Sequence, residues 1–296
     1  MLRRLSRTSF LKTTWRRVST AVVLLALGGS CGWAADPGAR TPILMELFTS
    51  EGCSSCPPVD VWVQKLDAAQ PVPGAEFIVL SEHVDYWNHD GWKDPYSSAK
   101  MTERQQEYMR RLGLSEVYTP QVILDGDVVL DPSQAEQVRQ DFSQLSGASM
   151  LPVRIESAAF EAGDPEMLTG QVAVDGAGSK LGGDVYLAVA LNQTVTDVLA
   201  GENDGKKLTN VAVVMSLVKI GKLEKGKDFE QSFRVKLWNG ADAANLRVVA
   251  FVQEPGVGKV VGAAMTRAIA TQQATVAGSS AHGGAAMQVL RLRGSR

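Results

Sequence analysis

The first half of the chain alternates between apolar runs and helical patterns. Residues 41–48 (TPILMELF) and 75–84 (AEFIVLSEHV) are near-continuous apolar runs, typical of strands buried on both faces. Between them, residues 57–69 carry apolar side chains at helical spacing. Pro57 and Pro58 suit the first turn of a helix, where no intrahelical N–H group is required. This stretch therefore predicts a strand, a helix and a second strand.

The same alternation continues to residue 146. Residues 98–114 have the composition of a helix that ends near Gly113. Residues 119–131 predict two short strands around an Asp-Gly turn, and residues 133–146 predict a helix. The order β-α-β-α-β-β-α predicts a sheet with helices on its faces. In such a sheet, loops that bind ligands lie beyond the carboxyl ends of the parallel strands.

After Pro152 the pattern changes to strand-like runs separated by turn signals. The runs are 152–160, 168–176, 183–198, 208–221, 228–238, 246–254 and 259–269. Runs of this kind predict a β-sandwich-like domain, although residues 208–223 are also compatible with a helix. We therefore expect an α/β domain over residues 40–148 and an all-β domain over residues 150–272.

Both ends of the chain fall outside this pattern. Residues 1–17 hold six positive charges and no acid, and a twelve-residue apolar stretch and small residues up to Ala34 follow. This arrangement predicts a secretory signal peptide over residues 1–34 and a periplasmic or secreted protein. An amphipathic membrane anchor is the alternative, and Thr8 stands where a twin-arginine signal has its second arginine. Residues 273–296, rich in Ala, Gly, Ser and Gln, predict a disordered tail.

Cys31 follows Gly-Gly-Ser, which resembles a lipoprotein cleavage box. Gly28 stands where such a box has leucine, so lipid anchoring at Cys31 is the less favoured hypothesis. Removal of residues 1–34 would leave 24 basic and 32 acidic side chains, a formal net charge of −8. That charge argues against nucleic acid and anionic membranes as partners, and we expect a soluble protein after signal cleavage.

Signal cleavage would leave Cys53 and Cys56 as the two cysteines of the mature chain. In an oxidising compartment they can pair only with each other. A purely structural disulfide across so short a loop would stabilise the fold by less than about 3 kcal/mol, the value for a disulfide that closes a 15-residue loop. A closed zinc site needs four ligands, and the histidines are His83, His89 and His282. Because His83 and His89 lie in one loop, a Cys₂His₂ site is the less favoured alternative, and we expect no metal site. A redox couple is the favoured interpretation, with Cys53 as the nucleophile and Cys56 as the resolving thiol.

The predicted helix after the cysteines favours a reactive thiolate at Cys53. The unpaired N–H groups at a helix start and the helix dipole stabilise negative charge there. We therefore expect Cys53 to be the more acidic and the more exposed of the two thiols. Glu51 opposes a thiolate, although only modestly if its carboxylate faces solvent.

Several polar and aromatic residues could support this couple. Glu46 interrupts an apolar strand, so it could relay a proton, face solvent at a sheet edge, or make a structural hydrogen bond to a neighbouring loop. His83 ends the second strand. It could adjust the pKa of the Cys53 thiol, bind substrate or ligate a metal, or it could be a loop histidine that makes only structural hydrogen bonds. Three aromatic residues of the following loop could form a lip for a peptide or thiol substrate, or pack beneath the loop. They are Trp87, Trp92 and Tyr96.

The order of strand, Cys-x-x-Cys, helix and a Thr-Pro pair before the third strand resembles the thioredoxin fold over residues 42–146. The resemblance makes Pro120, after Thr119, the candidate for a cis-proline that shapes a substrate groove beside the cysteines, and the isomer of the Thr119–Pro120 bond stays open. Thioredoxins carry Gly-Pro between the cysteines, and strong disulfide oxidants often carry Pro-His. Here Ser54 and Ser55 stand there, so the direction of electron flow stays open.

Four longer stretches together resemble the exported bacterial family DUF1223. They are ELFTSEGCSSCPP, HVDYWNHDGWKDPY, RQQEYMRRLGLSEVYTPQVILDG and GENDGKKLTNVAVV. The resemblance implies a thioredoxin-like domain followed by a β-rich domain, and it implies an architecture rather than a substrate.

The function expected from the sequence is that of an exported thiol–disulfide oxidoreductase without a cofactor. Its partner would be a protein or a small thiol or disulfide. Two alternatives remain open. Two thiolates with His83 nearby are a donor set that suits Cu(I), as in a periplasmic copper carrier. The β-rich domain could instead dock an envelope partner as a binding module that catalyses nothing.

Overall fold

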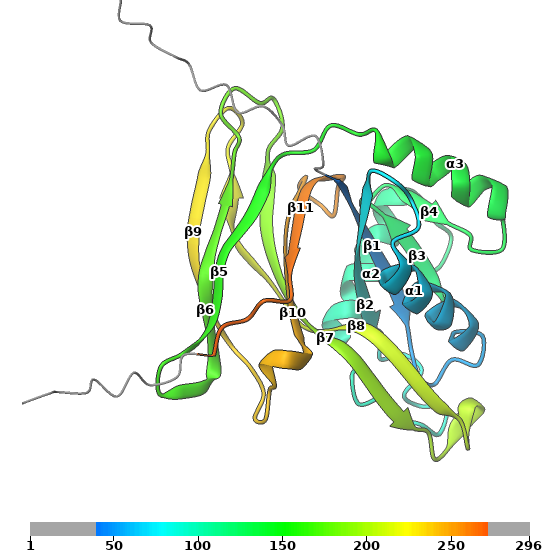
Figure 1. Ribbon diagram of the computed structural model, residues 1–296. Helices are drawn as coiled ribbons and strands as arrows, with labels where there is room; N and C mark the ends of the chain where they lie inside the picture. The colour runs from blue at the N-terminus through cyan, green and yellow to red at the C-terminus, as the bar shows by residue number, and fades with distance from the viewer. Residues whose placement is uncertain (1–39, 272–296) are drawn as a thin grey trace, which may run out of the picture. The chain divides into compact units, whose positions relative to one another are not determined.

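A computed structural model describes residues 40–271, which belong to one compact unit (Figure 1). The expected signal peptide over residues 1–34, with Cys31, lies outside the described residues, as do the expected tail over 273–296 and His282. Within the described part, no helix is long and apolar enough to cross a bilayer.

The first seven elements follow the predicted order. They are β1 (Thr41–Thr49), α1 (Pro57–Ala69), β2 (Ala75–His83), α2 (Ala99–Leu112), β3 (Gln121–Leu124), β4 (Val128–Leu130) and α3 (Ala135–Ser146). Helix α1 has its two prolines in the first turn, and it ends at Gln70, which adopts a left-handed conformation. Helix α2 ends at Gly113, with φ of 68°, as the sequence predicts.

The seven predicted strands of the second half are also confirmed. They are β5 (Val153–Glu161), β6 (Asp164–Val174), β7 (Gly183–Asp197), β8 (Lys207–Leu223), β9 (Phe229–Lys236), β10 (Leu246–Gln253) and β11 (Val260–Thr266). Two short 3₁₀ turns, η1 (Gly201–Asn203) and η2 (Ala243–Asn245), interrupt the connections. The segment that was also compatible with a helix is strand β8.

The expected pair of a thioredoxin-like α/β domain and a separate sandwich-like domain is wrong. The described residues are mostly β, and strands from both halves share one mixed sheet of order β11-β10-β7-β8-β2-β1-β3-β4. The halves meet where β2 runs parallel to β8, with Ser81 opposite Val213. A second sheet, of order β5-β6-β9, is separate in its hydrogen bonding.

Strand β10 shows why the two halves merge. All eight of its residues are buried, so both of its faces are covered. Val248, Ala250 and Val252 pack into a core shared with the β5-β6-β9 sheet. Val249 and Phe251 point the other way, into a core shared with β1, β2 and α2. A strand that is covered on each face by a different part of the chain joins those parts into one structure.

A buried ion pair also connects the halves. The Arg247 guanidinium on β10 donates to both carboxylate oxygens of Asp67 on α1, at 2.8 and 3.0 Å. Arg247 is 2% exposed and Asp67 is 9% exposed. This bidentate pair fixes the last turn of α1 against the sheet and thereby orients the helix that follows the cysteines.

Candidate functional site

Cys53 and Cys56 form a disulfide in the loop between β1 and α1. The loop is a tight turn, because Cys53 N donates to Ser50 O and Cys56 N donates to Cys53 O. Cys56 is the N-cap residue of α1. Both cysteines are 0% exposed, so the expectation that Cys53 is the more exposed sulfur is wrong for this oxidised form.

The predicted Thr-Pro pair lies beside the disulfide. The Thr119–Pro120 peptide bond, whose isomer the sequence left open, is cis. Thr119 O lies 3.8 Å from Cys53 Sγ. Ser55 Oγ lies 3.4 Å from Cys53 Sγ and donates to Thr119 O. The cysteine loop and the segment before β3 therefore form one surface.

The three aromatic side chains surround the cysteine loop and are half-buried. Trp87 Nε1 donates to Thr119 Oγ1 at 2.7 Å, and Trp92 Nε1 donates to Glu51 Oε2 at 3.1 Å. The Tyr96 ring meets the ring of His83 edge-on, with centroids 5.6 Å apart. Their polar atoms hold neighbouring loops together, and their role as a substrate lip stays a prediction.

His83 acts on the cysteine loop through Asp94. His83 Nδ1 lies 2.7 Å from Asp94 Oδ2, and both side chains are fully buried. Burial alone lowers the pKa of His83, but the Asp94 carboxylate outweighs it and the net shift is upward. The same Asp94 oxygen accepts the backbone N–H of Glu51 at 2.9 Å. The buried His83–Asp94 pair thus anchors the residue two positions before Cys53.

The Glu51 carboxyl does not face solvent, because the residue is 1% exposed. Its oxygens accept hydrogen bonds from Trp92 and from Asn210 Nδ2. Burial raises the pKa of Glu51, and the nearby Asp94 carboxylate raises it further. A carboxyl that resists ionisation opposes a neighbouring thiolate less than a permanent anion does.

Asp60 is a buried acid one helical turn after Cys56, and the sequence analysis missed it. Its carboxyl accepts a hydrogen bond from Thr49 Oγ1 at 2.8 Å, and the residue is 8% exposed. Burial raises the pKa of Asp60 to about 7. Side chains four residues apart share one face of a helix, so this carboxyl lies on the same face as Cys56.

The tip of the β7–β8 hairpin closes over the cysteine loop. Figure 1 shows β7 and β8 extending together beyond the rest of the sheet. Asn203, in η1, is 0% exposed and donates from Nδ2 to Glu51 O at 2.8 Å and to Cys53 O at 2.9 Å. Ser54 N donates to the Glu202 carboxylate at 3.2 Å. The tip thus reaches the cysteine loop through side chains.

Glu46 lies on the opposite face of β1 from the residues that pack against α1. Met45 and Leu47 face the α1 core, and the side chains of a strand alternate, so Glu46 faces α2. There it accepts a hydrogen bond from Arg104 Nε at 2.6 Å and another from Tyr108. Glu46 therefore makes structural hydrogen bonds, to a helix rather than to the neighbouring loop that was one of the alternatives.

The described residues do not group His83 with the two cysteines as metal ligands. No cluster of three or more Cys, His, Asp or Glu side chains in residues 40–271 has an arrangement that could hold a metal ion. His89 is exposed and lies beside Asp90.

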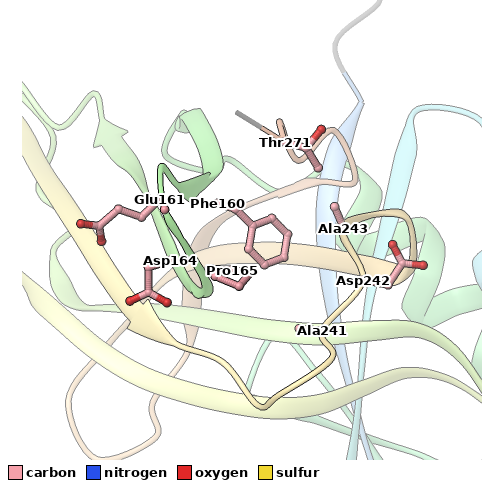
Figure 2. A pocket seen from close by; sticks show the side chains of 9 residues that line it. Phe160, Glu161, Asp164, Pro165, Ala241, Asp242, Ala243 and Thr271 are labelled. Atoms are coloured by element: carbon pink, nitrogen blue, oxygen red, sulfur yellow. The ribbon is translucent and has the colours of Figure 1, made fainter. Parts of the chain in front are cut away.

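A cavity of about 420 Å³ lies away from the cysteine loop, between the β5–β6 turn and η2 (Figure 2). Its acidic side chains are already engaged: Glu161 pairs with Arg234, and Asp242 accepts the N–H of Ala244. No residue of the cysteine loop lines it. The disulfide is therefore the chemically distinctive feature of the described residues.

Comparison with known proteins assigns a family but no activity. The model of a family described as "Protein of unknown function (DUF1223)" matches residues 44–253. No curated protein matches the chain. The crystal structure of protein AGR_C_4864 from Agrobacterium tumefaciens is similar, with 28% sequence identity and a TM-score of 0.59, over 78% of this chain and 95% of that one.

Two further solved structures are only weakly similar. The sporulation control protein Spo0M from Bacillus subtilis has 17% identity and a TM-score of 0.29, over 43% of this chain and 50% of that one. A domain of the outer membrane lipoprotein Omp28 from Porphyromonas gingivalis has 17% identity and a TM-score of 0.24, over 43% and 93%. These similarities are too weak to support an inference.

Proposed function

Since the chain belongs to the DUF1223 family, whose description assigns no function, we propose from its site that the protein exchanges thiols and disulfides through Cys53 and Cys56. One observation carries the proposal. The disulfide directly precedes α1, and Asp60, a buried carboxyl with a pKa of about 7, lies one turn into that helix. A disulfide that only braces the loop has no need of a proton acceptor.

The exchange proceeds through a mixed disulfide. A thiolate of a dithiol substrate attacks Cys53 Sγ, the Cys53–Cys56 bond breaks, and Cys56 leaves as a thiolate that takes up a proton. The second substrate thiolate then attacks the mixed disulfide, which releases the substrate as a disulfide and Cys53 as a thiolate. The protein disulfide gains two electrons, and the substrate loses two. Relative reduction potentials set the direction, so the reverse reaction uses the same groups.

Asp60 is the proposed partner of Cys56 in this step. Its pKa of about 7 lets it hold or release a proton near neutral pH. The hydrogen bond from Thr49 fixes its orientation. Asp60 takes the place that the sequence analysis gave to Glu46, because Glu46 is paired with Arg104 on the other face of the sheet.

The buried sulfurs require a local opening before exchange. The contacts of the β7–β8 tip with the cysteine loop are made by the side chains of Asn203 and Glu202. Side-chain hydrogen bonds to backbone contribute about 1 kcal/mol each, so the tip can lift at small cost without disturbing the sheet. Export, as expected from residues 1–34, would place this couple in an oxidising compartment.

Trapping of the mixed disulfide tests the proposal. The Cys56→Ser variant should react with an aromatic disulfide reagent and retain the reagent as a stable adduct on Cys53, because no resolving thiol remains. The reduced wild-type protein should release it within the mixing time, and mass spectrometry distinguishes the two. The Cys53→Ser variant is the control and should react at least about tenfold more slowly, because Cys56 lies within the start of α1. Equal adducts on both variants would contradict the assignment of Cys53 as the nucleophile.

A further inference from the structure

A groove of about 430 Å³ opens between α1 and the start of β8. One wall is a single face of α1, since the residues that line it are spaced by three and four positions: Pro57, Asp60, Val61 and Gln64. The other wall is the continuous segment 206–210. Pro57 directly follows Cys56, so the groove begins at the disulfide loop.

The second wall is the edge of a strand. Side chains of a strand alternate between its two faces, so the four consecutive β8 residues 207–210 line one cavity because the cavity lies along the strand's edge. On its other side this segment pairs with β7, from Asp197 opposite Lys207 to Gln193 opposite Val211. On the groove side the pairing of β8 with β2 is limited to Val213. Among the described residues, no strand pairs with the groove edge over residues 207–212.

The groove is apolar inside and basic at its rim. Val61 is 43% exposed in the groove, and Leu208 lies in the opposite wall. Lys206 and Lys207 stand at the hairpin end and are exposed. Asp60 adds little negative charge below pH 7 because burial holds its pKa at about 7. The groove therefore favours an apolar segment with acidic residues at one end.

The exposed apolar side chains of the described residues gather in the elements around this site. Val61 is on α1, and Tyr118 precedes Thr119, whose carbonyl lies near Cys53 Sγ. Val195 and Leu199 belong to the β7–β8 hairpin. Exposed apolar side chains that concentrate at one site mark a surface that binds a partner.

We propose that this groove binds an extended polypeptide segment as an added strand on the edge of β8. The backbone of the segment pairs with residues 207–210, an apolar side chain packs on Val61, and acidic residues lie near Lys206 and Lys207. This inference rests on the proposed function, for which it supplies the substrate class. A segment that leaves the groove at Pro57 passes the exposed Ser54 and Ser55, which places a substrate cysteine beside the disulfide.

Binding of a peptide without cysteine tests the groove separately from the redox chemistry. The probe is a labelled peptide of about six residues in which valine alternates with serine and two aspartates stand at one end. Fluorescence anisotropy with the oxidised wild-type protein should show saturable binding. Val61→Ser should weaken it about tenfold and Lys207→Glu about fivefold. Lys222→Glu, which alters an exposed lysine outside the groove, should leave it unchanged.

Two modified peptides test pairing with the strand edge. Alternate backbone nitrogens are methylated in one peptide, and the other set of nitrogens is methylated in the second. An added strand directs only every other N–H to its neighbour, so one peptide should lose binding and the other should keep it. Equal affinity of both, or no response to Val61→Ser and Lys207→Glu, would overturn the inference. The probe contains no cysteine, so its binding does not depend on thiol–disulfide exchange. If the mixed-disulfide trap fails, the peptide-binding result still tests the groove.

Discussion

Replacement of Asp60 by asparagine should make the protein more stable above pH 7 and slower in thiol–disulfide exchange. Burial raises the pKa of Asp60 from 3.8 to about 7. Between these values the folded protein holds a proton that the unfolded chain has released. The free energy of unfolding therefore falls as pH rises from about 4 to about 7, by up to about 4 kcal/mol for a shift of about three units. Asparagine removes this dependence.

The effect on exchange follows from the proposed role of the carboxyl. In the Asp60→Asn variant the amide oxygen would still accept the hydrogen bond from Thr49, but an amide cannot take up a proton from the medium or return it to Cys56. General acid–base groups contribute about 10²-fold or more, so we expect exchange at pH 7 to slow by about that factor. Stopped-flow exchange rates and urea unfolding at pH 5 and pH 8 measure the two effects.

Asp125 provides a matched control for the stability change. It is 0% exposed, burial raises its pKa to about 7, and its Oδ1 accepts the N–H of Leu44. It lies in the β3–β4 turn with φ of 44°, a conformation that asparagine also tolerates. Asp125→Asn should therefore stabilise the protein above pH 7 without slowing exchange. If it slows exchange as much as Asp60→Asn does, Asp60 has no special role.

Replacement of Arg104 by leucine should lower the free energy of unfolding by about 3–5 kcal/mol. Arg104 is 6% exposed and donates to Glu46 at 2.6 Å and to Gln253 at 3.1 Å. The Glu82 carboxyl lies 3.6 Å away, and both of its oxygens lack a hydrogen-bond partner in the described part of the chain. Burial and the nearby Glu46 raise the pKa of Glu82 well above its usual range.

The loss of stability in Arg104→Leu is large because the buried carboxyl groups that faced the guanidinium remain. Leucine removes the cation that faces the Glu46 and Glu82 carboxyls, so among the described residues Glu46 keeps only the hydrogen bond from Tyr108, and a buried carboxylate without a counter-charge is strongly destabilising. The double variant Arg104→Leu/Glu46→Leu should recover part of the loss. Arg110→Leu on the exposed side of α2 is the control, with a change within about 0.5 kcal/mol. A loss below about 1 kcal/mol for Arg104→Leu in urea unfolding would contradict this account of the core.

Local pattern was sufficient to predict the elements but not how they pair. Helical spacing in α1 and the strand runs from β5 to β11 are properties of neighbouring residues. The pairing of Ser81 with Val213 joins segments far apart in sequence, and periodicity has no information about it. The apolar run of β10 could have indicated the merged sheet. A strand that is apolar on both faces must be buried on both, whereas a strand in a two-layer sandwich has one face in solvent.

The site was predicted where the sequence motif is compact. Cys53 and Cys56 could be placed between the first strand and the first helix from the local pattern, whereas the position of Pro120 beside them came from the resemblance to the thioredoxin fold. The sequence analysis left Glu46 between a proton relay and a structural role, although the alternation of β1 was a usable signal: Met45 and Leu47, not Glu46, face α1. The four-residue spacing from Cys56 pointed to Asp60. No local pattern could show that Asn203, on a distant hairpin, holds the Cys53 carbonyl.

The reduction potential of the Cys53–Cys56 couple tests the central claim most directly. It is measured by equilibration of the protein with glutathione buffers and alkylation of the free thiols. A couple that exchanges with substrates should have a potential between about −120 and −270 mV, the span of proteins that catalyse such exchange. A potential below about −300 mV is that of a structural disulfide, and it would contradict the proposed function.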